Sequence, residues 1–322
     1  MKRALYSSCT AQNPGGFTTA DYRAIGLRCN LPPVKLNWSN AFHGIQGLAT
    51  IAFAVACGRI VDPPLPVSAT AFVPPPVYAK WWALTKSCSG ISGSLENISW
   101  YVVPGVEVFT LKKETVSAYW TEGSNSIVVA DFSVLDGSVV RHEMLHSLIR
   151  TRGHTRSAFL DHCLGVVSCA AACVADAGPP PRFDSPGPAL PADSIDVGID
   201  FLPNPPAGNV DGGVFSMVVS AHNRANRPVL VSLGPPGGSV AAPFSYDIRP
   251  AFFPGARLLG SITISDPALT RFAVGETKRQ YFDFVIGKAI TNRTITSGVY
   301  RVTASYGNHS TTISQFTIGA PP

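Results

Sequence analysis

Helix-like and strand-like patterns of apolar residues alternate in the first half of the chain after residue 77. Tyr78–Leu84 has the pattern of a short helix, and a longer helix is predicted over residues 139–148, which Asp136 or Ser138 can cap and Gly153 ends. Four intervening runs rich in β-branched and aromatic residues predict strands: Ser99–Val103, Val106–Leu111, Val116–Trp120 and Ser126–Ala130. A second helix is expected over 155–164. The mixture indicates an α+β domain.

The second half carries short apolar or alternating runs with turn residues between them and no helical period. The predicted strands are Ile195–Phe201, Val214–Ala221, Val229–Leu233, Phe244–Ile248, Leu258–Ile264, Tyr281–Ile286, Val299–Ser305 and Thr311–Ile318. Many short strands at near-even spacing are typical of an immunoglobulin-like β-sandwich. We therefore expect residues 194–322 to form an all-β sandwich domain.

Proline density marks two boundaries. Residues 58–77 and 178–193 each contain six prolines, and proline-rich segments are extended and semi-rigid. The first is interpreted as a tether and the second as a linker, which leaves 78–177 as a separate domain.

The first 57 residues contain an apolar run, Gly44–Cys57, that is too short to span a bilayer but suits a secretory signal. Ending in Ala-Val-Ala-Cys, it resembles the lipobox of bacterial lipoproteins, although Ala54 stands where such sequences usually have Leu. The resemblance implies lipidation at Cys57 and membrane attachment. The long stretch before the run suggests a start codon further downstream. The alternative is a buried N-terminal helix.

Charge and cysteine content narrow the classes of function. Of the net charge of +5, residues 1–56 carry five basic residues and one acidic residue, which is +4, so the rest has about +1. No basic stripe remains for nucleic acid. Four of seven cysteines, Cys88, Cys163, Cys169 and Cys173, fall in the 78–177 domain and predict two disulfides in an oxidising compartment, with three possible pairings. Free thiols with a zinc site are the alternative.

The chemistry is concentrated in His142-Glu143-Met144-Leu145-His146. Two histidines four residues apart lie on one face of a helix and can reach one metal ion. Glu143 is then placed to reach water at the metal and act as a general base. His154 follows shortly after the helix and is the predicted third ligand, with His162 as the alternate.

This helix resembles that of zincin metallopeptidases, over about residues 139–163. Ile149 and Arg152 occupy positions where metzincins have glycine and histidine, and the only glutamate after Glu143 is Glu276, so the metzincin and thermolysin-like patterns do not match. His154, with Phe159 after it, is similar to the compact SprT-like and WLM groups. The chain as a whole is also similar to bacterial lipoproteins of unassigned activity.

The resemblance implies an α+β zincin-like domain that binds Zn²⁺ through His142, His146 and His154. The strand pattern that follows it predicts the immunoglobulin-like sandwich. We expect an exported, cell-envelope peptidase acting on peptides or proteins, with Ser126–Ala130 as the edge strand that holds the substrate. Tyr119 and His162 are candidates for stabilising the oxyanion. The alternative is a non-enzymatic surface-anchored binding protein with a degenerate or structural zinc site, to which Cys163 could contribute.

Overall fold

The computed structural model describes residues 62–178, 194–202, 213–231, 243–251, 257–261, 271–287 and 294–318. The chain divides into two units, 1–57 and 58–322, and every described residue belongs to the second. The predicted leader at 1–57, with Cys57, lies outside the described residues, as does the predicted linker beyond Gly178. Within the described ranges, no helix combines the length and apolarity needed to cross a membrane.

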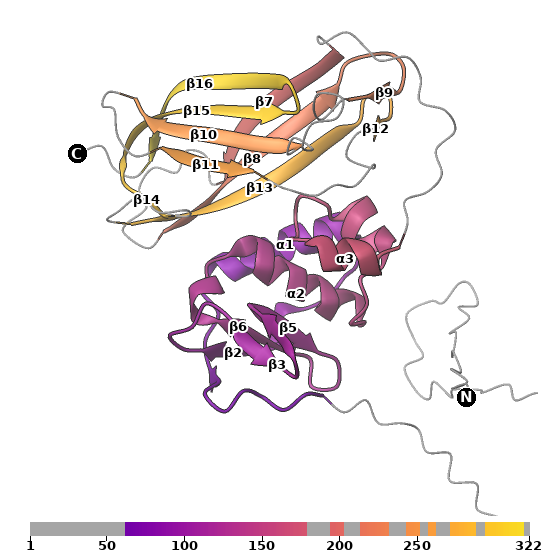
Figure 1. Ribbon diagram of the computed structural model, residues 1–322, viewed down its shortest axis with the longest axis vertical. Helices are drawn as coiled ribbons and strands as arrows, with labels where there is room; N and C mark the ends of the chain where they lie inside the picture. Colours follow the sequence, from indigo (N-terminus) through magenta and orange to yellow (C-terminus); the bar gives the residue numbers. More distant parts are fainter. Residues whose placement is uncertain are drawn as a thin grey trace, which may run out of the picture. The chain divides into compact units, whose positions relative to one another are not determined.

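Residues 62–178, the α+β part, combine helices with small sheets (Figure 1). Its helices are α1 (Val77–Ser89), η1 (Leu95–Asn97), η2 (Asp131–Ser133), α2 (Gly137–Ile149), η3 (Ser157–His162) and α3 (Ala171–Asp176). Its strands are β1 (Thr70–Ala71), β2 (Ser99–Val103), β3 (Phe109–Leu111), β4 (Glu114–Val116), β5 (Ala118–Thr121) and β6 (Ser126–Ala130). The two main helices and most of the strands were predicted. The second predicted helix, 155–164, is a shorter π-helical segment, η3.

The main sheet of this part has the order β1-β2-β6-β5. β2 and β6 are parallel, and the other neighbours are antiparallel. The prediction that Ser126–Ala130 is an edge strand is therefore wrong, because β6 is paired on both sides. The outer strand next to β6 is β5, and β1 is the outer strand on the other side of the sheet. β1 also brings the end of the predicted tether, residues 58–77, into the sheet.

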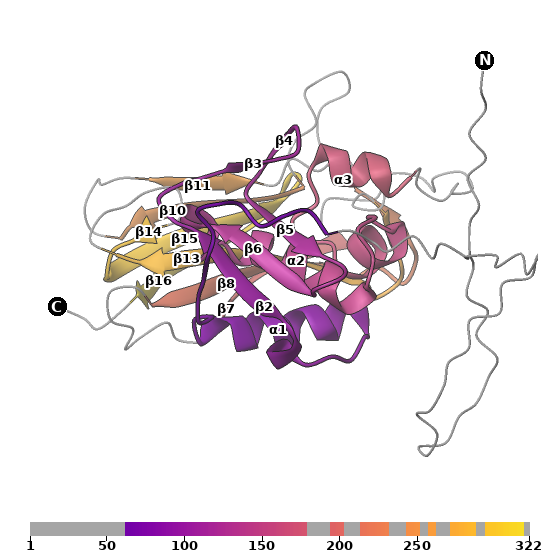
Figure 2. The same cartoon turned by 90° about the horizontal axis from the view of Figure 1, so that it is seen from below.

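Alternation along the strands separates two faces of this sheet. Val140, Met144 and Leu148, four residues apart on α2, pack with Trp120 and Ile127 in one core that also includes α1. The opposite face, with Tyr119 and Val128, is covered by the β3–β4 hairpin. In Figure 2 the strands β2, β6 and β5 lie in front of α2. The helix packs mainly against β5 and less against β6.

Two disulfides join elements of the α+β part, as the cysteine count predicted. Cys88 at the end of α1 pairs with Cys163 after η3, and Cys169 pairs with Cys173 in α3. The sulfur of Cys163 is therefore bonded to Cys88, which argues against its use as a thiolate metal ligand. Disulfides persist in oxidising compartments, so the pairing fits an extracytoplasmic location.

The described residues between 194 and 318, the β part, consist mostly of sheets. The strands are β7 (Ile195–Leu202), β8 (Val214–Asn223), β9 (Val229–Leu230), β10 (Phe244–Pro250), β11 (Leu258–Ser261), β12 (Arg271–Phe272), β13 (Thr277–Ile286), β14 (Thr294–Ile295), β15 (Gly298–Tyr306) and β16 (His309–Ile318). They form four-stranded sheets with the orders β11-β10-β15-β16 and β14-β13-β8-β7, and a β9–β12 pair. One apolar core lies between the two large sheets, and β16 contacts β7 across their edges, so that the sheets curl as half a barrel (Figure 1).

Candidate metal centre

The helix α2 begins and ends where it can present its histidines. The Asp136 carboxylate accepts hydrogen bonds from the backbone N–H groups of Ser138 and Val139, as a predicted N-cap does. The predicted end at Gly153 is wrong: the helix ends at Ile149, and Arg150 is in the left-handed conformation (φ 55°) with its N–H bonded to the His146 carbonyl. This earlier end turns the chain back toward the histidines.

Three histidines, His142, His146 and His154, come together at this turn. Nε2 of His142 lies 3.1 Å from Nε2 of His154 and 3.2 Å from Nε2 of His146. One ring nitrogen from each residue lies within 4.8 Å of the other two. The i,i+4 spacing brings the first two together, and the chain reversal after α2 adds the third.

The other nitrogen of each ring has its own hydrogen-bond acceptor. Nδ1 of His142 faces the Ser168 carbonyl, Nδ1 of His146 lies 2.7 Å from the Thr151 carbonyl, and Nδ1 of His154 lies 3.0 Å from the carboxylate of Asp176. Carbonyl and carboxylate oxygens only accept, so each Nδ1 carries the hydrogen. In the neutral rings each Nε2 therefore presents a lone pair to the other two.

Three lone pairs directed at one point repel unless a cation lies between them. A proton is a poor candidate, because burial lowers the pKa of His142 to about 3 and that of His146 to about 4, and the neighbouring histidines add to the effect. Neutral imidazoles with a fixed Nδ1–H are the form in which histidine binds metals. The arrangement is thus a possible metal site.

Aromatic rings enclose the three histidines. The ring of Phe159, which is fully buried, has its centroid 5.0 Å from His142, 4.9 Å from His146 and 4.8 Å from His154. The Trp120 indole lies parallel to the His146 ring at 6.2 Å and donates to Asn125, 2.8 Å away. These contacts restrict the ring orientations.

Glu143 lies beside the cluster, but its carboxylate is not one of the converging ligand atoms. Its side chain is buried, and burial raises its pKa to about 8, against a hydrogen bond from the backbone of Trp120 that lowers it. Trp120 belongs to β5, so this contact joins α2 to the outer strand of the sheet. The carboxylate is therefore placed at the strand edge rather than in the ligand set.

Two residues predicted for the site lie elsewhere. His162 is exposed at the end of η3 and is not part of the histidine cluster. Tyr119 packs on the face of the sheet opposite α2, with its ring against Phe109. Neighbours in a strand point to opposite faces, so Trp120, and not Tyr119, reaches the histidines.

The acceptors behind the histidine rings, namely Asp176 and the Ser168 and Thr151 carbonyls, were not predicted from the sequence. Asp176 accepts from both the backbone N–H (2.8 Å) and Nδ1 of His154, and these bonds lower its pKa. Backbone carbonyls leave no signal in residue identity, so only the fold could show them.

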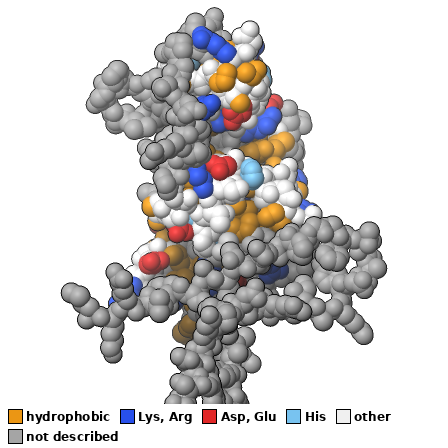
Figure 3. Space-filling view, turned by 90° about the vertical axis from the view of Figure 1, so that its right-hand side faces the viewer, with side chains coloured by type: hydrophobic (Ala, Val, Ile, Leu, Met, Phe, Trp, Pro, Cys, Tyr) orange, Lys and Arg blue, Asp and Glu red, His pale blue; other side chains and the backbone are white. Residues whose placement is uncertain are grey.

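Part of the surface of the molecule is visible in Figure 3. A histidine side chain reaches this surface next to an acidic one. Lys and Arg side chains alternate with Asp and Glu over its described residues, without gathering into a field of one sign. Independently of this view, side-chain exposure of 22% for His154 and 55% for Asp176 places one edge of the histidine cluster in contact with solvent.

Comparisons with known proteins assign no family. No protein-family model matches the chain, and no curated protein does. Among solved structures, a Pseudomonas fluorescens alkylpurine DNA glycosylase, AlkC, bound to DNA containing an abasic site analog, matches with a TM-score of 0.27 and 13% identity over 39% of this chain and 31% of that one. The putative ApaA protein from Bordetella pertussis matches with a TM-score of 0.23 and 16% identity over 42% of this chain and 98% of that one.

Proposed function

We propose that the protein is a zinc-dependent peptidase whose metal ligands are His142, His146 and His154. The observation that carries the proposal is the convergence of three Nε2 lone pairs with every Nδ1 hydrogen bonded elsewhere. Tetrahedral zinc with Zn–N distances of roughly 2.0–2.1 Å separates its nitrogen ligands by about 3.3 Å. The observed separations of 3.1 and 3.2 Å fit that value.

The ligand set favours a catalytic site over a structural one. Structural zinc sites are closed by four protein ligands, often cysteines, whereas catalytic sites use three and leave a position open. Among the described residues, the group of side chains that could hold a metal ion consists of three histidines. Cys163 is held in a disulfide. A zinc ion at this point would supply a Lewis acid that acidifies water and polarises a substrate carbonyl.

Glu143 is the proposed proton carrier. Its position next to the first ligand and beside the outer strand lets it take a proton from the attacking water and deliver it to the leaving amine. Burial favours the protonated carboxyl and a nearby cation favours the carboxylate, so the group can hold the proton between the two steps.

The outer strand β5 is the proposed place for an extended peptide substrate. β5 pairs with β6 on one side only, and an unpaired strand edge offers backbone groups for an added strand. Trp120 in this strand contacts both His146 and Glu143. A peptide along β5 would therefore lie beside the proposed catalytic group.

We also propose a fold type for each of the two parts. The α+β part is interpreted as zincin-like because a sheet with an antiparallel outer strand packs on the helix that carries the motif. The β part is interpreted as an immunoglobulin-like sandwich because two sheets share one core. The two disulfides support export; anchoring through Cys57 remains a separate proposal.

The test is cleavage of a mixed peptide library by the zinc-loaded protein and by Glu143→Gln. We expect the variant to retain one equivalent of zinc and to lose cleavage by at least about 100-fold, in line with the contribution of a general base. Glu114→Gln, on the exposed hairpin strand β4, is the matched control and should cleave normally. A wild-type protein that binds zinc but cleaves nothing, or a Glu143→Gln variant as active as wild type, would refute the peptidase.

A further inference from the structure

Arg141, the residue before His142, points away from the histidines and into the β part. Its side chain is fully buried, and that of Asp283 on β13 is 4% exposed. Nη2 of Arg141 lies 2.9 Å from Oδ2 of Asp283, and Nη1 lies 3.2 Å from Oδ1. This bidentate pairing joins the helix of the candidate metal centre directly to a strand 142 residues later in the chain.

The surroundings of this ion pair hold it in one geometry. The guanidinium lies 5.8 Å from the ring centroids of both Trp81 and Tyr281, and the hydroxyl of Ser216 donates to Asp283 Oδ1 at 2.6 Å. A Cβ on Gly137 would lie 2.4 Å from the Asp283 carboxylate, so the first turn of α2 needs glycine to approach so closely.

A second contact lies close by at Gly165. The N–H of Tyr281 donates to the Gly165 carbonyl at 3.0 Å, and a Cβ on Gly165 would lie 1.9 Å from the Arg279 carbonyl. Gly165 has φ +88°, which other residues rarely adopt. The backbone of β13 therefore touches the segment after η3, on the side of the candidate metal centre.

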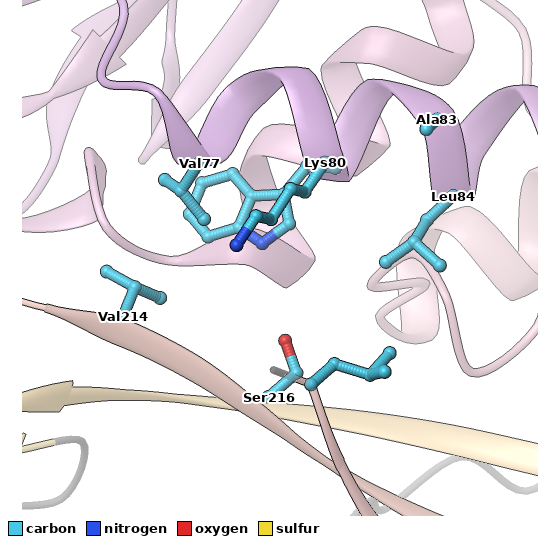
Figure 4. A pocket seen from close by; sticks show the side chains of 8 residues that line it. Val77, Lys80, Ala83, Leu84, Val214 and Ser216 are labelled. Atoms are coloured by element: carbon cyan, nitrogen blue, oxygen red, sulfur yellow. The ribbon is translucent and has the colours of Figure 1, made fainter. Parts of the chain in front are cut away.

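Elsewhere the two parts leave a space between them. A cavity of about 430 Å³ separates Val77, Lys80 and Leu84 of α1 from Val214 and Ser216 of β8 (Figure 4). Trp81 and Ser216 line this cavity and also contact the Arg141–Asp283 pair. Because packing is incomplete at this cavity, the specific contacts at Asp283 and Gly165 contribute a larger share of the interaction between the α+β part and the β part.

The ion pair connects to the first metal ligand through one short segment. Nε of Arg141 donates to the Val166 carbonyl at 2.5 Å. Two residues later, the Ser168 carbonyl accepts from Nδ1 of His142, and the Ser168 N–H donates to the Ser138 carbonyl at 3.0 Å. Arg141 thus fixes the segment that orients the His142 ring.

We propose that Asp283, in the β part, is a positioning residue for the metal centre. Asp283 binds the Arg141 guanidinium through two hydrogen bonds, and Arg141 donates a third to the Val166 carbonyl. Two residues further on, the Ser168 carbonyl accepts from Nδ1 of His142 and so keeps Nε2 of that ring directed toward the other histidines. Without the carboxylate, a buried guanidinium loses its partner and must move toward water. The inference rests on the proposed metal centre, and it does not depend on the protein being a peptidase.

The experiment measures cobalt binding to the full-length chain after chelation, by competition with a chromophoric chelator and by the visible spectrum of the bound ion. Asp283→Asn removes the charge and keeps the shape. Asp247→Asn is the matched control, because Asp247 is an ion-paired carboxylate of the β part, bound to Arg249 and Arg257. Ser216→Ala removes only the hydroxyl that supports Asp283. Amide hydrogen exchange of the metal-free proteins reports on residues 166–168.

Partners behind metal ligands typically change affinity by about 10–100-fold. We expect a loss of that size with an altered cobalt spectrum in Asp283→Asn, a smaller loss in Ser216→Ala, and less than about twofold change in Asp247→Asn. Exchange at 166–168 should accelerate in Asp283→Asn, to a smaller extent in Ser216→Ala, and not in Asp247→Asn. Wild-type affinity and spectrum in both Asp283→Asn and Ser216→Ala would overturn the proposal, as would equal losses in Asp283→Asn and Asp247→Asn.

Two further outcomes are also decisive. If Asp283→Asn does not fold, Ser216→Ala decides, and wild-type cobalt affinity in that variant overturns the proposal. If the wild-type chain binds no cobalt, the metal centre itself is refuted, and this positioning role falls with it. A chain that binds cobalt and cleaves no peptide leaves the proposal standing while the peptidase fails.

Discussion

Removal of the Asp176 carboxylate tests whether the hydrogen-bonded partners of the histidines prepare a metal site. Asp176 accepts two hydrogen bonds from His154, one from the backbone N–H at 2.8 Å and one from Nδ1 at 3.0 Å. Asp176→Ala would free the ring to rotate and to exchange its tautomer, so that Nε2 no longer points at the other two nitrogens for all of the time. The variant should bind zinc more weakly.

The exposure of Asp176 sets the size of the effect. Partners behind metal-bound histidines are worth about 10–100-fold in affinity. The Asp176 side chain is 55% exposed, and solvent screens its charge, so we expect the lower end, about tenfold. Asp176→Asn keeps a side-chain oxygen that can accept from Nδ1 and should recover part of the loss.

The assay is competition for zinc with a chelating dye at fixed pH. Asp161→Ala is the control: it removes the same charge from η3, where Asp161 pairs with Arg156 at 3.4 Å. Zinc affinity in Asp176→Ala equal to that of wild type would refute the reasoning about the ring. An equal loss in Asp161→Ala would show that net charge, rather than the contact with His154, sets the affinity.

The remaining predictions concern the disulfides and acid stability. Loss of the Cys88–Cys163 disulfide, which spans 75 residues, should lower the free energy of unfolding by about 4 kcal/mol. Loss of Cys169–Cys173, which spans four residues, should lower it by about 2 kcal/mol, because a shorter loop restricts the unfolded chain less. Denaturant titration of serine variants measures both changes, and equal losses would contradict the ranking. In metal-free protein, the free energy of unfolding should fall as pH drops from 6.5 to 4.5. In that range His142 and His146 bind protons in the unfolded chain but stay neutral over most of the range in the folded protein, where their pKa values are about 3 and about 4. Glu143 has the opposite effect, because its folded pKa of about 8 keeps its proton bound in the folded protein. The two histidine protons outweigh the single glutamate proton, so the unfolded chain binds more protons and stability falls. Urea titrations at both pH values check this, and the decline should be shallower when both histidines are replaced by asparagine.

Local sequence was sufficient to predict the helix of the motif and most of the strands. Asp136 and the apolar spacing of Val140, Met144 and Leu148 define α2 through contacts within a few residues, and the four-residue spacing alone places His142 and His146 on one face. The residue that terminates α2 was predicted three positions too late, because Gly153 is a strong local signal and a non-glycine residue, Arg150, takes the left-handed position instead.

Tertiary structure decided the features that depend on contacts distant in sequence. The choice of His154 over His162, the pairing of Cys88 with Cys163 and the outer position of β5 all follow from how the chain returns on itself. The Arg141–Asp283 pair joins residues 142 positions apart. Local patterns encode which face of an element is apolar, whereas partners brought together by packing leave no periodic trace in the sequence. The sequence by itself therefore determined that one helix face carries two histidines, and only the fold determined which residues complete the possible metal site and hold it.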